Sequence, residues 1–199
     1  MRILIFGLAI VATTLVVSKN TNKSPESLNL SISDQSISKT ENANFMTSLV
    51  TDEENTGSIK EIVSAYLQMK NAFTEDNSTG AATAGKKLEA AFKNFDKSAL
   101  TTDQKKTYED VEADAREHAE HIGANGGKIA HQREHFELLS KDIYDLIKTF
   151  GGGQVLYRDF DPMVNKGKGA YWISETKEIK NPYMGKAMLT SGTVKEEIK

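Results

Sequence analysis

The sequence contains no cysteine. This absence excludes disulfide frameworks, thiolate zinc sites, iron–sulfur clusters, cysteine nucleophiles and the lipid-attachment cysteine of a bacterial lipoprotein. An excess of one charge is also missing, because 25 basic and 28 acidic residues leave a formal net charge of -3. Such a balance provides no electrostatic footprint for nucleic acid or anionic lipid. With 38% hydrophobic residues among 199, the chain can fill one real core and is predicted to form one acidic, thiol-free domain with extensions.

Long apolar runs are scarce, and the longest stands at the N-terminus. Arg2 precedes fifteen apolar or small residues from Ile3 to Val17. This run is shorter than the roughly 20 residues of a membrane-spanning helix, so it predicts a signal peptide over residues 1–18, cleaved after Ser18. An uncleaved anchor is the alternative. We therefore expect a periplasmic or secreted protein without membrane insertion after cleavage, whose residues 19–57 form a disordered polar tether.

Helical periodicity dominates residues 58–153. Apolar residues recur three or four positions apart in four successive segments, each followed by a short break such as Asn125-Gly126-Gly127. A capping box at Thr101-Thr-Asp-Gln104 marks the start of the third segment. Four helices with short connections predict a mainly α fold, an up-down antiparallel four-helix bundle. The predicted inward positions are Ile59, Ile62, Val63, Tyr66, Met69, Lys70, Phe73, Ala81, Ala84, Leu88, Ala91, Phe92, Phe95, Tyr108, Val111, Ala115, His118, Ile122, Ile129, Phe136, Leu139, Ile143, Leu146, Ile147 and Phe150.

The last segment, residues 154–199, has a different composition. It holds the only tryptophan, and two short runs, 155–160 and 170–174, read as strands separated by a Gly- and Lys-rich loop. A stretch of this length cannot form its own core, so we expect a C-terminal strand and loop extension of the same domain, packed against the bundle. Trp172 should pack inward and Tyr171 should face solvent, because neighbouring strand residues point to opposite faces.

All four histidines fall within eighteen residues. His118 and His121 are spaced i, i+3 on the third predicted helix, and His131 and His135 are spaced i, i+4 on the fourth. Both spacings place two imidazoles on one helix face, and the turn between the helices brings both pairs to the same end of the bundle. Neutral imidazole binds zinc, copper and nickel, so these residues are candidate metal ligands. The alternatives are a hydrogen-bonded core role for His118 and a solvated surface role for His121.

The string His131-Gln-Arg-Glu134-His135 also satisfies the H-x-x-E-H pattern of inverted zinc peptidases. That pattern fixes only three residues, and chance matches are common in charged helices. A domain of this size has little surface from which to build a peptide-binding cleft. The sequence also contains neither a phosphate-binding loop nor a nucleophile elbow. We therefore predict that the protein is not an enzyme.

The C-terminal segment carries a more specific pattern. It contains Asp161-Pro162-Met163, Ala170-Tyr-Trp-Ile-Ser174, Asn181-Pro-Tyr-Met-Gly185 and Met188-Leu-Thr-Ser191-Gly192. Together with the histidine segment, these motifs resemble the family called domain of unknown function 3347. Members are exported proteins or C-terminal units of periplasmic adaptors in copper and silver efflux systems. The resemblance covers about residues 59–192.

The resemblance implies a soft-metal site, and this chain departs from it at two positions. The family pattern reads Cys-Pro-Met and Met-x-x-Cys-Gly, whereas this chain has Asp161 and Ser191 at the cysteine positions and keeps Met163 and Met188. Three interpretations follow: metal binding has been lost, it depends on thioether and imidazole alone, or the cysteines have been replaced deliberately. Methionines that merely fill gaps between the extension and the bundle are the simplest alternative.

These observations lead to one expected function and one alternative. We expect a non-enzymatic envelope domain that binds or handles copper or silver, using Met163, Met188, His131 and His135 and passing the ion to an efflux or metal-transfer partner. The alternative is a metal-free protein-interaction module of an envelope complex. Close approach of the methionine sulfurs to the histidines would favour the first.

Overall fold

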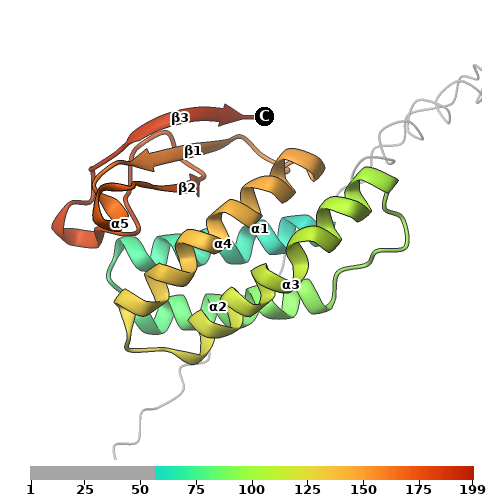
Figure 1. The fold of residues 1–199 in the computed structure, drawn as a ribbon, viewed down its shortest axis with the longest axis horizontal. Helices are drawn as coiled ribbons and strands as arrows, with labels where there is room; N and C mark the ends of the chain where they lie inside the picture. Colours follow the sequence, from blue (N-terminus) through green and yellow to red (C-terminus); the bar gives the residue numbers. More distant parts are fainter. Residues whose placement is uncertain (1–56) are drawn as a thin grey trace, which may run out of the picture. The chain divides into compact units, whose positions relative to one another are not determined.

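The computed structural model describes residues 57–199, and four helices occupy the first part of this range (Figure 1). Each helix packs against the next, and α1 also packs against α4, which closes the bundle. The prediction of a mainly helical domain with four packed helices is confirmed. The predicted signal peptide and tether lie outside the described residues, except for Gly57, where the first helix begins. The helices are α1 (Gly57–Thr74), α2 (Ser78–Lys93), α3 (Thr102–Ala124) and α4 (Ile129–Phe150).

Local sequence signals set the helix ends. The backbone N–H of Gln104 donates to Thr101 Oγ1 at 3.2 Å, and the Thr101 N–H donates to Gln104 Oε1 at 3.0 Å. This reciprocal capping box satisfies two backbone donors that an α-helix start leaves free, and it confirms the predicted start of α3. At the same end of the bundle, Gly151 ends α4 with φ of 80°, a conformation that glycine adopts without steric cost.

The core of the bundle follows the apolar faces of the helices. Tyr66 of α1 stacks on Phe136 of α4 with ring centroids 5.1 Å apart, and Phe73 meets the same ring edge-on at 5.0 Å. Every predicted inward position is buried except His118, Ile129 and Phe150, which are partly buried. The predicted periodicity therefore identifies the faces that pack together.

A small antiparallel sheet follows the bundle, with the strand order β2-β1-β3. The first two strands match the predicted ones closely, whereas β3 was not predicted. In Figure 1 the sheet lies over α1 and α4, and β2 is the strand that packs on both helices. The backbone N–H of Ile173 donates to Tyr66 Oη at 3.1 Å, which ties β2 to the core. As predicted, Trp172 is buried and Tyr171 is exposed. The strands are β1 (Leu156–Asp161), β2 (Ala170–Ser174) and β3 (Thr193–Ile198), with the one-turn helices α5 (Val164–Gly167) and η1 (Gly185–Ala187) between them.

Arg133 of α4 joins the C-terminal extension to the bundle. Its Nε donates to Pro182 O at 2.7 Å, and its Nη2 donates to Phe73 O at 2.8 Å and to Asp76 Oδ1 at 2.7 Å. The guanidinium therefore connects α4, the end of α1 and the extension at once. This contact confirms that the extension packs against the bundle rather than standing apart.

Within residues 57–199, no helix combines the length and apolar character that crossing a membrane requires.

Candidate metal-binding site

The four histidines converge where the end of α3 meets the start of α4. The rings of His121 and His135 have centroids 4.5 Å apart, and those of His131 and His135 are 4.7 Å apart. One ligand atom from each of these three residues lies within 4.8 Å of the others. The helical spacing and the tight turn between α3 and α4 thus bring both predicted pairs together.

His118 joins this cluster through a hydrogen bond. Its Nδ1 lies 3.1 Å from Nδ1 of His135, so one ring donates and the other accepts. Burial lowers the pKa of His118, although the carboxylates of Glu117 and Asp114 oppose this shift. Burial also lowers the pKa of His135, and the three neighbouring imidazoles lower it further. Both rings are therefore biased toward the neutral form, which is the form that binds metals.

The other two histidines lie at the surface. The side chains of His121 and His131 are 45% and 43% exposed, and each has an acidic neighbour on its own helix. Glu134 Oε2 lies 3.4 Å from His131 Nδ1, and the Glu134 side chain is 77% exposed. A general base of a peptidase has to face a bound water in a sheltered cleft, which this exposed position does not provide. The histidine cluster is instead open to solvent.

The donor set fits borderline metal ions. Three imidazoles suit Cu(II), Zn(II) and Ni(II), whereas soft Cu(I) and Ag(I) favour sulfur. A tetrahedral ion with metal–nitrogen bonds of about 2.0–2.1 Å holds its ligand atoms roughly 3.3 Å apart. Because the three ligand atoms lie within 4.8 Å of one another, small side-chain rotations would bring them to that spacing.

A second candidate set lies on the C-terminal extension. Ser191 Oγ donates to Asp161 Oδ2 at 2.8 Å, and Asn181 Nδ2 donates to the same oxygen at 2.7 Å. The backbone N–H of Met163 donates to Asp161 Oδ1 at 2.9 Å, and that of Ser191 donates to Met188 O at 3.1 Å. Met163 and Met188 are 56% and 42% exposed, so neither is a gap-filling core residue. The fold therefore brings the predicted residues Asp161, Met163 and Met188 together with Ser191, and the Asp161 carboxylate is engaged in hydrogen bonds.

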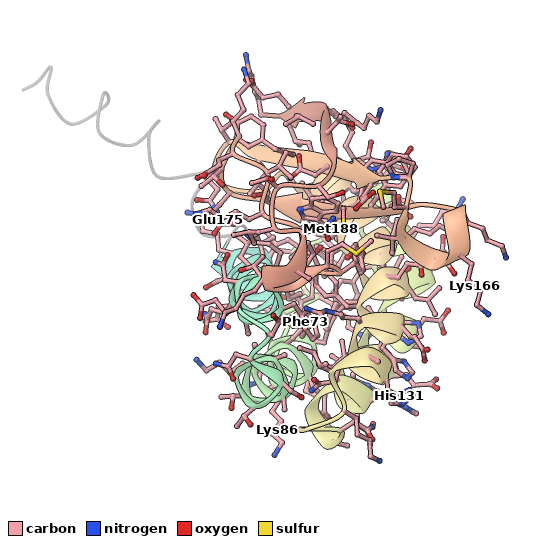
Figure 2. All side chains as sticks on the ribbon, turned by 90° about the vertical axis from the view of Figure 1, so that its left-hand side faces the viewer. Phe73, Lys86, His131, Lys166, Glu175 and Met188 are labelled. Carbon is pink, nitrogen blue, oxygen red and sulfur yellow. The ribbon has the colours of Figure 1, made fainter. Side chains whose placement is uncertain are left out.

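The two sets do not form one site. Residues two positions apart on an α-helix point about 200° apart, so His131 and His135 face away from Arg133 and Glu137. His135 meets α3 through His118, whereas Arg133 binds Pro182 O and Glu137 accepts from Asn165 Nδ2. The histidines and the extension thus occupy opposite faces of α4. Figure 2 shows the same separation, with Met188 beside the sheet and His131 lower on the bundle.

A buried polar cluster between α1 and the sheet was not predicted as a site. Lys70 is fully buried and forms an ion pair of 2.8 Å with Glu175. Asp159 of β1 is fully buried too, and neither of its carboxylate oxygens has a hydrogen-bond partner among residues 57–199. Burial raises the pKa of Asp159 to about 7, against an opposing effect of Lys70. A hint in the sequence was Lys70 itself, a charged residue at an inward helical position.

The fold and the histidine cluster define a four-helix-bundle domain with a candidate metal site. Residues 62–154 match the model of the family described as "Protein of unknown function (DUF3347)". The matched range contains the bundle and all four histidines and ends before Asp161. Searches of curated proteins and of solved structures found no match.

Proposed function

We propose that the protein is an exported, non-enzymatic domain that binds a transition-metal ion through His121, His131 and His135. One observation carries the proposal: ligand atoms of these three imidazoles lie within 4.8 Å of one another. Copper as Cu(II) is the best match, because nitrogen sites bind Cu(II) more tightly than the other divalent first-row ions. Zn(II) is the main competitor.

The surroundings of the cluster support a role in metal handling rather than catalysis. Two of the three ligands are partly exposed, so an ion can enter and leave without opening the bundle. Such access suits transfer of the ion to an envelope efflux or metal-transfer partner. A groove of about 520 Å³ between α1 and α2, lined by Lys60, Ala65, Lys87 and neighbouring residues, contains none of the candidate ligands. The chemistry and the groove are therefore separate, unlike in an enzyme whose catalytic groups line its cleft.

A second candidate function is soft-metal binding at the extension. Met163 and Met188 are exposed residues, and their backbones hydrogen-bond to Asp161 and Ser191, which are themselves hydrogen-bonded to each other. Thioethers prefer Cu(I) or Ag(I), but without a thiolate they bind weakly. This candidate would give the chain a cuprous or silver site separate from the histidines.

Calorimetric titration of the full chain distinguishes the two candidates. Cu(II), Zn(II), Cu(I) and Ag(I) are titrated into the wild type, the double variant His131→Gln with His135→Gln, and the double variant Met163→Leu with Met188→Leu. We expect one Cu(II) per chain, with affinity reduced at least about 100-fold in the glutamine variant and unchanged in the leucine variant. This loss corresponds to about 2.7 kcal/mol.

Other results select other functions. Binding of Cu(I) or Ag(I) that disappears only in the leucine variant would assign the site to the extension. If the wild type binds none of the four ions, the metal-free interaction module takes the place of the metal-binding function.

A further inference from the structure

We infer that His118 is a positioning residue for the site: it accepts a hydrogen bond from His135 and thereby leaves Nε2 of His135 free to bind the ion. The inference rests on the proposed metal-binding function and adds a role for the fourth histidine. His118 is not among the three residues whose ligand atoms cluster. Its contact with the cluster is the 3.1 Å approach to Nδ1 of His135.

The tautomers follow from that single contact. A neutral imidazole carries one N–H and one acceptor nitrogen, so a hydrogen bond between two Nδ1 atoms requires one donor and one acceptor. If His118 donated, the proton of neutral His135 would lie on Nε2, and His135 would have no free lone pair for a metal. If His135 donates, its Nε2 is unprotonated and can bind. Metal binding at His135 therefore requires His118 to accept.

The charges around His118 favour that direction. Glu117 and Asp114 lie on the same helix and act electrostatically on the His118 ring. Their negative field makes His118 the better acceptor and stabilises a proton on its other nitrogen, Nε2. Around His135, the groups that act on its ring are His121, His118, His131 and Glu134, of which only Glu134 is an acid. The same negative field raises the basicity of the bound His135, as carboxylate–histidine pairs do in metal sites.

Two substitutions separate a positioning role from a ligand role. His118→Asn can place its carbonyl oxygen where Nδ1 lies, so it keeps the acceptor but cannot reach the ion as Nε2 could. His118→Phe keeps the size of the ring and removes both nitrogens. Thermal unfolding of the metal-free variants checks that both fold. Cu(II) and Zn(II) affinities are then measured for each full-length chain, and ¹⁵N NMR of the metal-free protein at pH 8 reports the tautomer of His135.

We expect the asparagine variant to stay within about threefold of the wild type in metal affinity. The phenylalanine variant should lose 10- to 100-fold, the usual effect of removing a partner that orients a ligating histidine. NMR should show the His135 proton on Nδ1 in the wild type and in the asparagine variant, and a mixture of tautomers in the phenylalanine variant.

Several outcomes would overturn the inference. Equal losses in both variants would make His118 a ligand, and unchanged affinity in both would leave it without a role. If the wild type binds no metal, the proposed function fails. In that case the tautomer still decides the inference, because a His135 proton found on Nε2 contradicts it independently of any metal.

Discussion

Ser191 Oγ donates a hydrogen bond of 2.8 Å to Asp161 Oδ2, and these are the two positions at which the resemblance in sequence implies cysteines. Thirty residues separate them in sequence, yet the pairing of β1 with β3 and the turn at Asn181 bring them into contact. The Ser191 hydroxyl thus donates to the Asp161 carboxylate. Two thiolates at the same positions would supply two ligands for a soft metal ion. The contact therefore shows that the fold can hold two side chains of this size at ligand spacing.

Replacing both residues with cysteine tests whether the fold still supports a soft-metal site. We expect Asp161→Cys with Ser191→Cys to raise Cu(I) affinity at least about tenfold, or about 1.4 kcal/mol, measured by competition with a Cu(I) chelator. The two single cysteine variants are the controls and should gain less. Metal-free stability should fall by about 1–3 kcal/mol, because Asn181 Nδ2 and the Met163 N–H lose their carboxylate acceptor. Unchanged Cu(I) affinity in the double variant would remove the extension from consideration as a copper site.

The helices could be predicted because their signals are local. The apolar spacing of α1–α4 and the capping box at Thr101 depend on residues within a few turns of one another. The convergence of the histidines was predictable for the same reason, since a tight turn joins their two helices. Helical phase also separates His135 from Arg133, but the element that covers each face of α4 depends on the tertiary fold.

The features that were missed depend on contacts distant in sequence. Strand β3 has exposed polar residues alternating with Val194, Glu196 and Ile198, so its own sequence lacks a clear apolar pattern. It becomes a strand because β1 offers an edge for pairing. Asp159 reads as a surface residue in sequence, and only the packing of β1 opposite Trp172 buries it. Neither outcome follows from local propensity.

Metal should stabilise the protein without being required for folding. The bundle and sheet share a core of thirty buried apolar residues, so the wild type should keep a cooperative thermal transition after exhaustive chelation. Adding Cu(II) to 100 times its Kd should then stabilise the folded state by about 2.7 kcal/mol. The double variant His131→Gln with His135→Gln is the control and should show no such gain. Loss of the cooperative transition on chelation contradicts the prediction.

Two facing glycines should differ in their tolerance of alanine. A Cβ at Gly85 would lie 2.8 Å from Ala119 O and 2.9 Å from Gly123 N, both backbone atoms of α3. A Cβ at Gly123 would meet the flexible Lys86 side chain at 3.0 Å and backbone no nearer than 3.3 Å. Because α2 and α3 would have to move apart, Gly85→Ala should destabilise by about 2 kcal/mol or more.

Gly123→Ala is the matched control for that substitution. The gain in helix propensity, up to about 1 kcal/mol, offsets part of the cost of the close contacts that the new methyl group makes. The loss of stability should therefore be clearly smaller than for Gly85→Ala. Chemical denaturation of both variants gives the comparison. Equal losses would mean that the close approach of α2 and α3 is not what requires glycine at position 85.

Because Asp159 is buried, we expect the free energy of unfolding to fall as the pH rises. Burial raises its pKa from 3.8 to about 7, so between these values the folded state holds a proton that the unfolded state releases. The contribution of Asp159 to the free energy of unfolding is therefore greatest below about pH 4, and it is lost as the pH rises toward 7. Asp159→Asn keeps the shape of the protonated form and cannot ionise. The variant should exceed the wild type in unfolding free energy at pH 8, by on the order of 3 kcal/mol, and match it near pH 4.

Asp110→Asn provides the control for this pH dependence, because Asp110 is an exposed carboxylate on α3. Denaturation is followed at pH 4, 6 and 8 for the wild type and both variants. Taking differences from the wild type cancels the contributions of groups that all three chains share, including Asp142, whose pKa burial raises to about 6. Only the Asp159 variant should show a difference that grows with pH. A difference that stays constant from pH 4 to pH 8 would mean that Asp159 is ionised in the folded protein throughout, held by Lys70 despite its burial.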